Sequence, residues 1–316
     1  MTAPSGDGPS GGAPAGDAAV RTVLGDIPPG RLGVCDAHDH LFLTSPVLPG
    51  QELDDPRAAR AELAAFAAHG GRAVVQWTPW GMGRRLADLP ALSRDCGVHI
   101  VAATGLHQAR HYRHIPDGLA ELFVAELTAG AGLIKVAGAF HHLDAHARDV
   151  MTAAAHAHHA TGAPIGVHLE GGTAALDTLD HLCGTHGVAP ERVVLGHLHR
   201  FPDTRLHLQA AQAGAYLAFD GPSRAHHAAD AHLLDALVAL AEAGHTDQIL
   251  LGGDTVTAAA RSTADGPGMP YLLTTLRPRV AYELGDAAAE AIFVRNPARA
   301  FAASWTRPRL PAPDAT

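Results

Sequence analysis

The chain has 316 residues, of which 47% are hydrophobic and 17% charged, and its formal net charge is −9. This length fits two ordinary domains or one α/β barrel of about 250 residues. The negative charge and the lack of a basic run exclude a nucleic-acid-binding stripe. No apolar stretch approaches the ~20 residues of a membrane span. We therefore expect a small-molecule substrate as the partner, and neither a nucleic acid nor a membrane.

The two ends of the chain are rich in small residues and proline, which predicts flexible tails at 1–20 and 306–316 around a folded domain at 21–305. The N-terminal segment has neither a basic start nor an apolar centre, so it does not read as a secretory signal. Three cysteines, Cys35, Cys96 and Cys183, are widely spaced without a CxxC motif. This usage predicts reduced thiols and a cytoplasmic location.

Short apolar runs typical of β-strands recur along the chain and alternate with Ala/Leu-rich segments of helical period. Eight such runs are expected as strands, at 33–42, 72–78, 99–106, 132–139, 164–170, 192–198, 215–221 and 248–254. Strands alternating with helices predict a parallel sheet, and eight units predict closure into a (β/α)8 TIM barrel. The alternative is an open doubly wound sheet, which favours a Gly-rich phosphate turn directly after an early strand, and no GxGxxG motif follows any of these runs.

Polar side chains inside these apolar strands need an explanation, because burying an unpaired polar group costs several kcal/mol. They fall mostly at the carboxyl ends of the strands, which meet at the active-site mouth of a barrel. Six are expected to converge there: His38, His40, Lys135, His168, His197 and Asp254. Histidine and carboxylate ligands suit Zn²⁺ and its neighbours, and six donors exceed the needs of one tetrahedral ion. The set therefore indicates two metal ions.

Lys135 is the unusual member, because an ammonium has no lone pair for a metal. Burial beside cations lowers the pKa of such an amine, which could then take up carbon dioxide as a bridging carbamate. The alternatives are an ion pair of Lys135 with Glu170 or Asp254, and a Schiff-base amine in a metal-free isomerase or lyase. Taken singly, each histidine could be a satisfied core residue, and Asp254 could be a helix N-cap.

Several quoted segments together resemble the phosphotriesterase family of the amidohydrolase superfamily: TVLGDIPPGRLGVCDAHDHLFL, GLIKVAG, VVLGHLHR, ILLGGD and FVRNPARAFA. The resemblance covers about residues 22–304. It implies that His38, His40 and Asp254 hold one ion and that His168 and His197 hold the other, with carbamylated Lys135 as the bridge. Zn²⁺ is the expected metal, although Mn²⁺, Co²⁺ and Fe²⁺ accept the same ligands. Barrels of this kind commonly pair, so a homodimer is expected.

The chemistry implied by the resemblance is hydrolysis, in which a metal-bridging hydroxide attacks a carbonyl carbon or a phosphorus and Asp254 accepts its proton. Family members often carry an acid three residues after the histidine of the sixth strand, where this chain has Arg200. After the seventh strand, Gly221 stands where some organophosphate-cleaving members have a histidine. Both departures place the usual proton relay in question.

The segment after the seventh strand also carries Arg224, a pattern that resembles the lactonase-type or uncharacterised branch of the family. We therefore predict a lactone, carboxylic ester or phosphotriester substrate, contacted by Arg224, Tyr112 and His107. Two alternatives stay open at this point: a hydrolase of N-acyl amide bonds with the same metal site, and a metal-binding barrel without catalysis.

Overall fold

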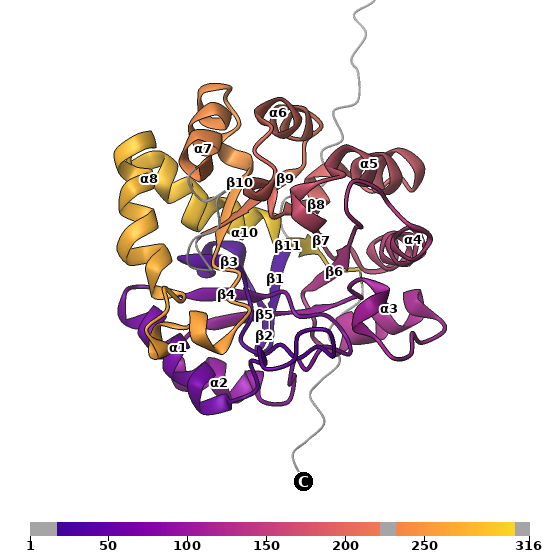
Figure 1. Ribbon diagram of the computed structural model, residues 1–316, viewed down its shortest axis with the longest axis horizontal. Coiled ribbons are helices and arrows are strands. Elements are labelled where there is room, and N and C mark those ends of the chain that lie inside the picture. The colour runs from indigo at the N-terminus through magenta and orange to yellow at the C-terminus, as the bar shows by residue number, and fades with distance from the viewer. Residues whose placement is uncertain (1–17, 222–231, 307–316) are drawn as a thin grey trace, which may run out of the picture.

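The computed structural model describes residues 18–221 and 232–306, and it confirms the predicted (β/α)8 barrel (Figure 1). Eight parallel strands pair with one another in chain order from β3 to β10. They are β3 (Cys35–Asp39), β4 (Ala73–Gln76), β5 (His99–Thr104), β6 (Leu133–Ala137), β7 (Ile165–His168), β8 (Val193–Gly196), β9 (Tyr216–Asp220) and β10 (Ile249–Gly252). The last strand returns to the first, where the Asp254 N–H donates to the His38 carbonyl at 2.9 Å. Each strand lies inside one of the eight predicted runs.

Helices surround the strands in Figure 1, and local sequence explains where several of them begin and end. They are α1 (Pro56–Ala68), α2 (Leu89–Cys96), α3 (Leu119–Ala129), α4 (Ala145–Thr161), α5 (Ala175–Leu179), α6 (Thr204–Gln212), α7 (Leu233–Glu242), α8 (Arg277–Leu284), α9 (Asp286–Glu290) and α10 (Asn296–Ala300). Asp55, Asp144 and Asp203 cap the first turns of α1, α4 and α6 by accepting backbone N–H groups. Gly97 and Gly162 end α2 and α4 in the left-handed conformation.

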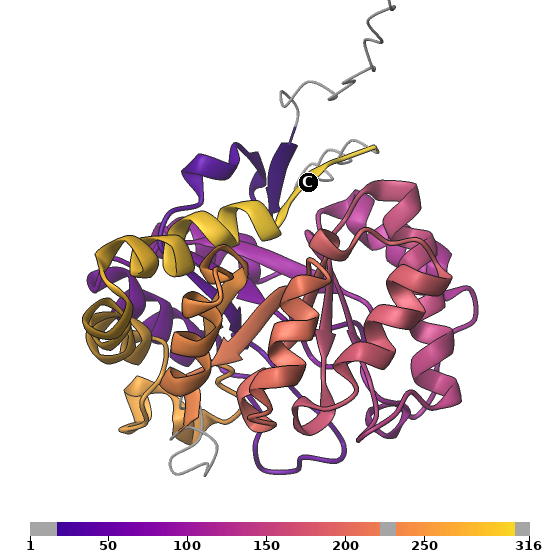
Figure 2. The ribbon, with the colours of Figure 1, turned by 90° about the horizontal axis from the view of Figure 1, so that it is seen from above.

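A small antiparallel sheet lies at the amino-terminal end of the barrel. It consists of β1 (Ala18–Thr22), β2 (Gly25–Ile27) and β11 (Ala302–Ser304). The N–H of Val23, just after β1, donates to the Ile100 carbonyl near the start of β5 at 2.8 Å. Figure 2 shows indigo β1 at this end of the molecule. β1 thus begins inside the segment 1–20 that the sequence predicts as a flexible tail. At the other end, Thr306 is the first residue of the predicted tail 306–316, and its N–H donates to the Thr161 carbonyl at 3.1 Å.

The floor of the mouth is a tryptophan that fills the barrel interior. Trp77 is fully buried, and its indole N–H donates to the Ala37 carbonyl at 2.8 Å. Two strand glycines leave room for the ring: an added Cβ would lie 2.9 Å from it at Gly166 and 3.3 Å at Gly196. The ring stacks on His38 with the centroids 4.0 Å apart. The packed core therefore supports the polar site directly.

Cys35, Cys96 and Cys183 all lie among the described residues, and all three are free thiols, as the sequence predicts. Among the helices of these residues, none has the length and the apolar character needed to cross a membrane.

Candidate metal centre

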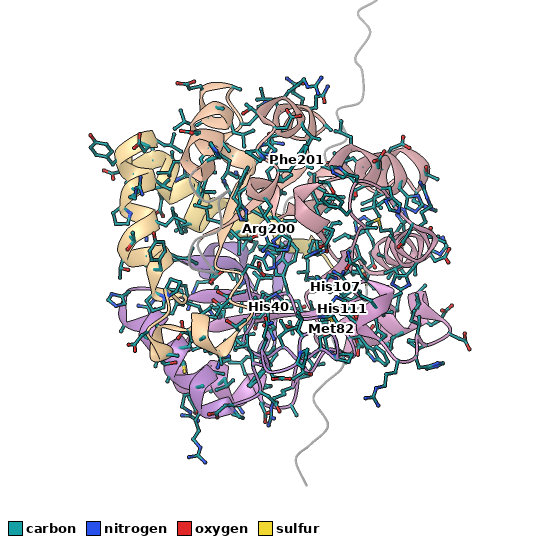
Figure 3. The ribbon with its side chains drawn as sticks, viewed as in Figure 1. His40, Met82, His107, His111, Arg200 and Phe201 are labelled. Carbon is teal, nitrogen blue, oxygen red and sulfur yellow. The ribbon has the colours of Figure 1, made fainter. Side chains whose placement is uncertain are left out.

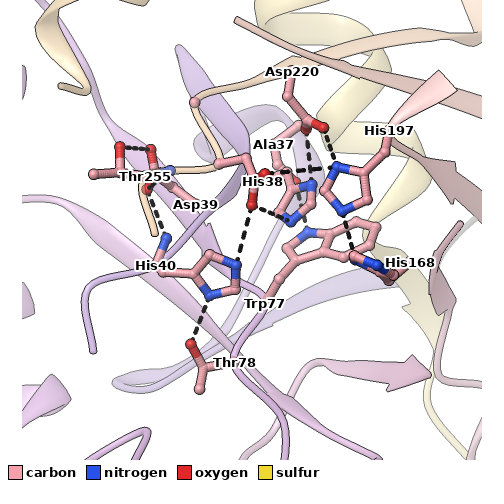
Figure 4. A network of polar contacts seen from close by, with 12 residues as sticks. Ala37, His38, Asp39, His40, Trp77, Thr78, His168, His197, Asp220 and Thr255 are labelled. Carbon is pink, nitrogen blue, oxygen red and sulfur yellow. Dashed lines mark hydrogen bonds and ion pairs between the residues drawn. The ribbon is translucent and has the colours of Figure 1, made fainter. Parts of the chain in front are cut away.

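The barrel brings the six predicted donors together at its mouth. Five of them line one pocket: His38, His40, Lys135, His168 and Asp254. The sixth, His197, lies directly beside them, with its Nε2 atom 2.7 Å from Nδ1 of His168 (Figure 4). These side chains come from β3, β6, β7, β8 and β10 or from the residues just after them. Parallel strands place their carboxyl ends at one rim, which is why positions 216 residues apart in sequence can meet.

Each of the four histidines has one ring nitrogen in contact with a polar side chain outside the set of six donors. Nδ1 of His40 lies 2.7 Å from Thr78 Oγ1, and Nε2 of His168 lies 3.1 Å from Glu170 Oε2. A single carboxylate serves the other two: Asp220 Oδ1 lies 2.9 Å from His38 Nδ1, and Asp220 Oδ2 contacts His197 Nδ1. Partners of this kind hold a metal-binding imidazole in the required tautomer and orientation.

The other four ring nitrogens fall into two groups. Nε2 of His38 and Nε2 of His40 lie 3.6 Å and 3.4 Å from Oδ1 of Asp254. The second group is Nδ1 of His168 and Nε2 of His197, the pair at 2.7 Å. Ligand atoms of His38, His197 and Asp254 also lie within 4.8 Å of one another. Nitrogen and carboxylate donors at these separations fit divalent metal ions of the Zn²⁺ type.

Lys135 lines the same pocket as a buried amine. Burial lowers its pKa from 10.5 to about 7, against the opposing effect of the Asp254 and Glu170 carboxylates. Among the described residues, the amine forms no ion pair with either of these acids. A neutral amine without a carboxylate partner is the state from which a carbamate can form, and the predicted alternative of an ion pair is not the arrangement seen here.

The predicted substrate contacts have three different outcomes. His107 lines the pocket, stacks on His111 with centroids 4.4 Å apart and meets the edge of His168 at 4.6 Å. Tyr112 does not line the pocket, because its hydroxyl accepts the backbone N–H of His107 at 2.7 Å and so supports the loop from behind. Arg224 lies outside the described residues.

Comparison with protein-family models matches residues 18–301 to the phosphotriesterase family. The chain belongs to the phosphotriesterase family. A phospho-furanose lactonase of Mycoplasmopsis agalactiae is 31% identical over 252 residues, which cover 69% of this chain and 71% of the relative. An N-acetyltaurine hydrolase of Tetraodon nigroviridis is 27% identical, in an alignment that covers 88% of this chain and 96% of the relative. The crystal structure of a lactonase from Listeria monocytogenes superposes with a TM-score of 0.84 at 28% identity, over 90% of this chain and 98% of that one.

The phosphotriesterase family consists of metal-dependent hydrolases, and the cluster of His38, His197 and Asp254 is a group that could hold a metal ion. Its departure from the family pattern at Arg200 has a clear structural consequence. The Arg200 guanidinium donates to Asp254 Oδ2, while Oδ1 of the same carboxylate faces His38 and His40. Burial by itself would raise the pKa of Asp254, but His197 and Arg200 hold it well below its usual range. The carboxylate is therefore kept ionised.

Three residues that anchor the histidines did not emerge from the sequence as site residues: Asp220, Glu170 and Thr78. A usable signal existed for Asp220, which ends β9 just as His168 ends β7, and is 1% exposed. The rule that polar residues at strand ends belong to the mouth would have included it. Thr78 gives no such signal, because a threonine after a strand is common in any barrel.

Proposed function

We propose that this protein is a binuclear metal-dependent hydrolase that opens a lactone or a related carboxylic ester. The observation that carries the proposal is the division of the ring nitrogens of the four histidines: one nitrogen of each contacts Asp220, Glu170 or Thr78, and the remaining four form two groups. Four histidines that only filled space in the core would not need one ring nitrogen held by a polar partner and the other grouped with further donors. His38, His40 and Asp254 would hold one ion, His168 and His197 the other, and carbamylated Lys135 would link them. Zn²⁺ is the expected metal.

When bound, two such metal ions would supply a water molecule activated at neutral pH and a Lewis acid for the scissile carbonyl. The chain's own residues supply the rest. Asp254, held as an anion by Arg200, accepts a proton at its carboxylate and returns it to the leaving oxygen. Burial, and to a smaller extent the charge of Lys135, lowers the pKa of His107 well below 6.5, so His107 lines the pocket as a neutral imidazole. We propose that His107 contacts the substrate, and the contact predicted for Arg224 stays a proposal from the sequence.

The names of the relatives support a carbonyl substrate that carries an anionic group. A phospho-furanose lactone presents a ring ester and a phosphate, and N-acetyltaurine presents an amide and a sulfonate. The second candidate function is therefore hydrolysis of an N-acyl amide, favoured by the match to N-acetyltaurine hydrolases over 88% of this chain. Lactone and amide hydrolysis use the same attack on a carbonyl carbon, so one site can serve either.

A hydrolysis screen at controlled metal loading tests the proposal. The protein, loaded with Zn²⁺, Mn²⁺, Co²⁺ or Fe²⁺ in bicarbonate buffer, is assayed with lactones, N-acyl amides and phosphotriesters, and again after chelation. Turnover of a lactone that is lost with the chelator and restored by metal supports the proposal. Turnover restricted to amides selects the second candidate, and no turnover with full metal occupancy identifies a metal-binding barrel without catalysis. Borohydride labelling of Lys135 with substrate would instead indicate a Schiff base.

A further inference from the structure

We propose that Arg200 forms an anion subsite beside Asp254, at which a phosphate, sulfonate or carboxylate group of the substrate binds. The inference rests on the proposed function, because the anionic group is taken to belong to the molecule that is hydrolysed. It assigns to a single side chain the recognition of that group.

The backbone turns sharply to bring Arg200 over the mouth. β8 ends at Gly196, and His197 then adopts a φ of 66°, a left-handed conformation that is uncommon outside glycine. A short 3-10 helix, η6 (Leu198–Arg200), follows, in which the Arg200 N–H donates to the His197 carbonyl at 3.0 Å. The side chain of Arg200 is 17% exposed and lines the pocket with the metal-site residues. Figure 3 shows it near the middle of the barrel, across from Met82.

The charges around the pocket favour an anionic ligand at this point. Asp254 is the one carboxylate among the described residues that line the pocket. Arg200 is the one arginine in that lining, and a guanidinium stays charged at any physiological pH. The other polar residues of this lining are histidines and Lys135, so an anionic group that enters the pocket can meet the guanidinium of Arg200.

The guanidinium also retains the capacity to bind. It carries five N–H donors, and the structure uses one nitrogen, Nη2, for Asp254 Oδ2. No other partner of its side chain occurs within 18–221 and 232–306. A planar fork of this kind matches the paired oxygens of phosphate, sulfonate and carboxylate groups, which a lysine would meet only as a point charge.

The nearest competitor for this role is less suitable. Arg110 lies near the rim, but its side chain is 60% exposed, it is paired with Glu170 at 3.4 Å, and it does not line the pocket. The apolar part of the pocket lining is Leu43, Leu48, Pro79, Met82 and Val256. Pro79 and Met82 follow β4, which is four strands from β8 in the eight-stranded barrel, so these two residues lie across the mouth from the segment that carries Arg200. A substrate with one anionic end and one less polar end fits between them.

Paired substrates give the decisive test. The ratio of kcat/KM for an anionic lactone to kcat/KM for its neutral analogue is measured in the wild type, Arg200→Gln, Arg200→Lys and Arg205→Gln, with metal content recorded for each. Because both substrates meet the same fraction of loaded protein, the ratio does not depend on metal loading. We expect a fall of about 10- to 100-fold in Arg200→Gln, as for a lost hydrogen-bonded charge, and a smaller fall in Arg200→Lys. The matched control, Arg205→Gln, alters an arginine that is 83% exposed on α6 and should keep the ratio.

Binding of inorganic phosphate to the metal-loaded protein, measured by titration calorimetry, separates this inference from the proposed function. Weaker phosphate binding in Arg200→Gln than in Arg205→Gln supports the subsite even if no lactone is turned over. Equal phosphate binding in the two variants, or an unchanged substrate ratio in Arg200→Gln, overturns it. In that case Arg200 only positions Asp254, and both substrates should lose activity by the same factor while the hydrolase function stands.

Discussion

Replacement of Asp220 by asparagine should weaken the binding of both metal ions at once. The carboxylate is 1% exposed and offers one oxygen to His38 and the other to His197, which would be ligands of different ions. Asparagine keeps one acceptor oxygen and replaces the other with an NH2 donor. The histidine that faces this donor must accept at Nδ1, which places its proton on Nε2, the nitrogen that would bind the metal.

The expected magnitude follows from the number of histidines affected. Loss of one outer partner of a ligand typically costs 10- to 100-fold in metal affinity. One histidine of Asp220→Asn should lose its metal-binding tautomer, and the other loses a charged partner for a neutral one. We therefore expect a decrease of about 10- to 100-fold for each ion, or about 1.4 to 2.7 kcal/mol each. Thr78→Val should affect one ion only, because Thr78 contacts His40 alone among the four histidines.

Metal affinity is measured by competition with a chromophoric chelator, and stoichiometry by elemental analysis. Asp144→Asn is the matched control, since the Asp144 side chain caps α4, does not line the pocket, and asparagine caps a helix equally well. Circular dichroism and the urea midpoint establish that each variant is folded. A folded Asp220→Asn protein that binds two ions with the affinity of the wild type would refute the reasoning, because the two histidines would then not depend on the carboxylate between them.

Three further predictions concern stability. Burial lowers the Lys135 pKa to about 7, so the unfolded chain binds more protons above that pH. The free energy of unfolding of the metal-free protein, measured by urea titration in CO₂-free buffer, should therefore rise by up to about 2.7 kcal/mol from pH 7 to 9. Lys135→Met should remove this rise, and an equal dependence on pH in the variant and the wild type would contradict the prediction. Chelation should lower Tm by several degrees, since ions at a hundredfold excess over Kd add about 2.7 kcal/mol, and an unchanged Tm would argue against bound metal. Gly166→Ala places a Cβ 2.9 Å from Trp77 and should cost about 1–3 kcal/mol in urea titrations, whereas Gly30→Ala, with nothing within 4 Å, should not.

The barrel could be predicted from the sequence because its strands are covered on both faces. A parallel strand between an interior and a ring of helices is apolar along its whole length, and the runs around Val74 and Leu250 have this character. The ends of the strands were less predictable. The predicted runs extended to 198 and 254, but β8 ends at Gly196 and β10 at Gly252. Each is followed within two residues by a site residue with positive φ, His197 at 66° or Asp254 at 49°.

The six candidate metal ligands could be predicted from the sequence, whereas the position of Arg200 could not. The six donors follow from the rule that polar residues at the ends of apolar strands face the mouth, and this rule needs no side-chain geometry. The direction of Arg200 depends on a backbone turn at His197 that a histidine seldom makes, so nothing local in the sequence indicates it. Conformations of this kind persist where the surrounding structure holds them and are concentrated at functional sites. The turn at His197 lets one short segment supply both a histidine of the candidate metal site and the cation that contacts Asp254. The sequence identified Arg200 only as a departure from the family pattern, and the structure places it in contact with the carboxylate expected to move the proton.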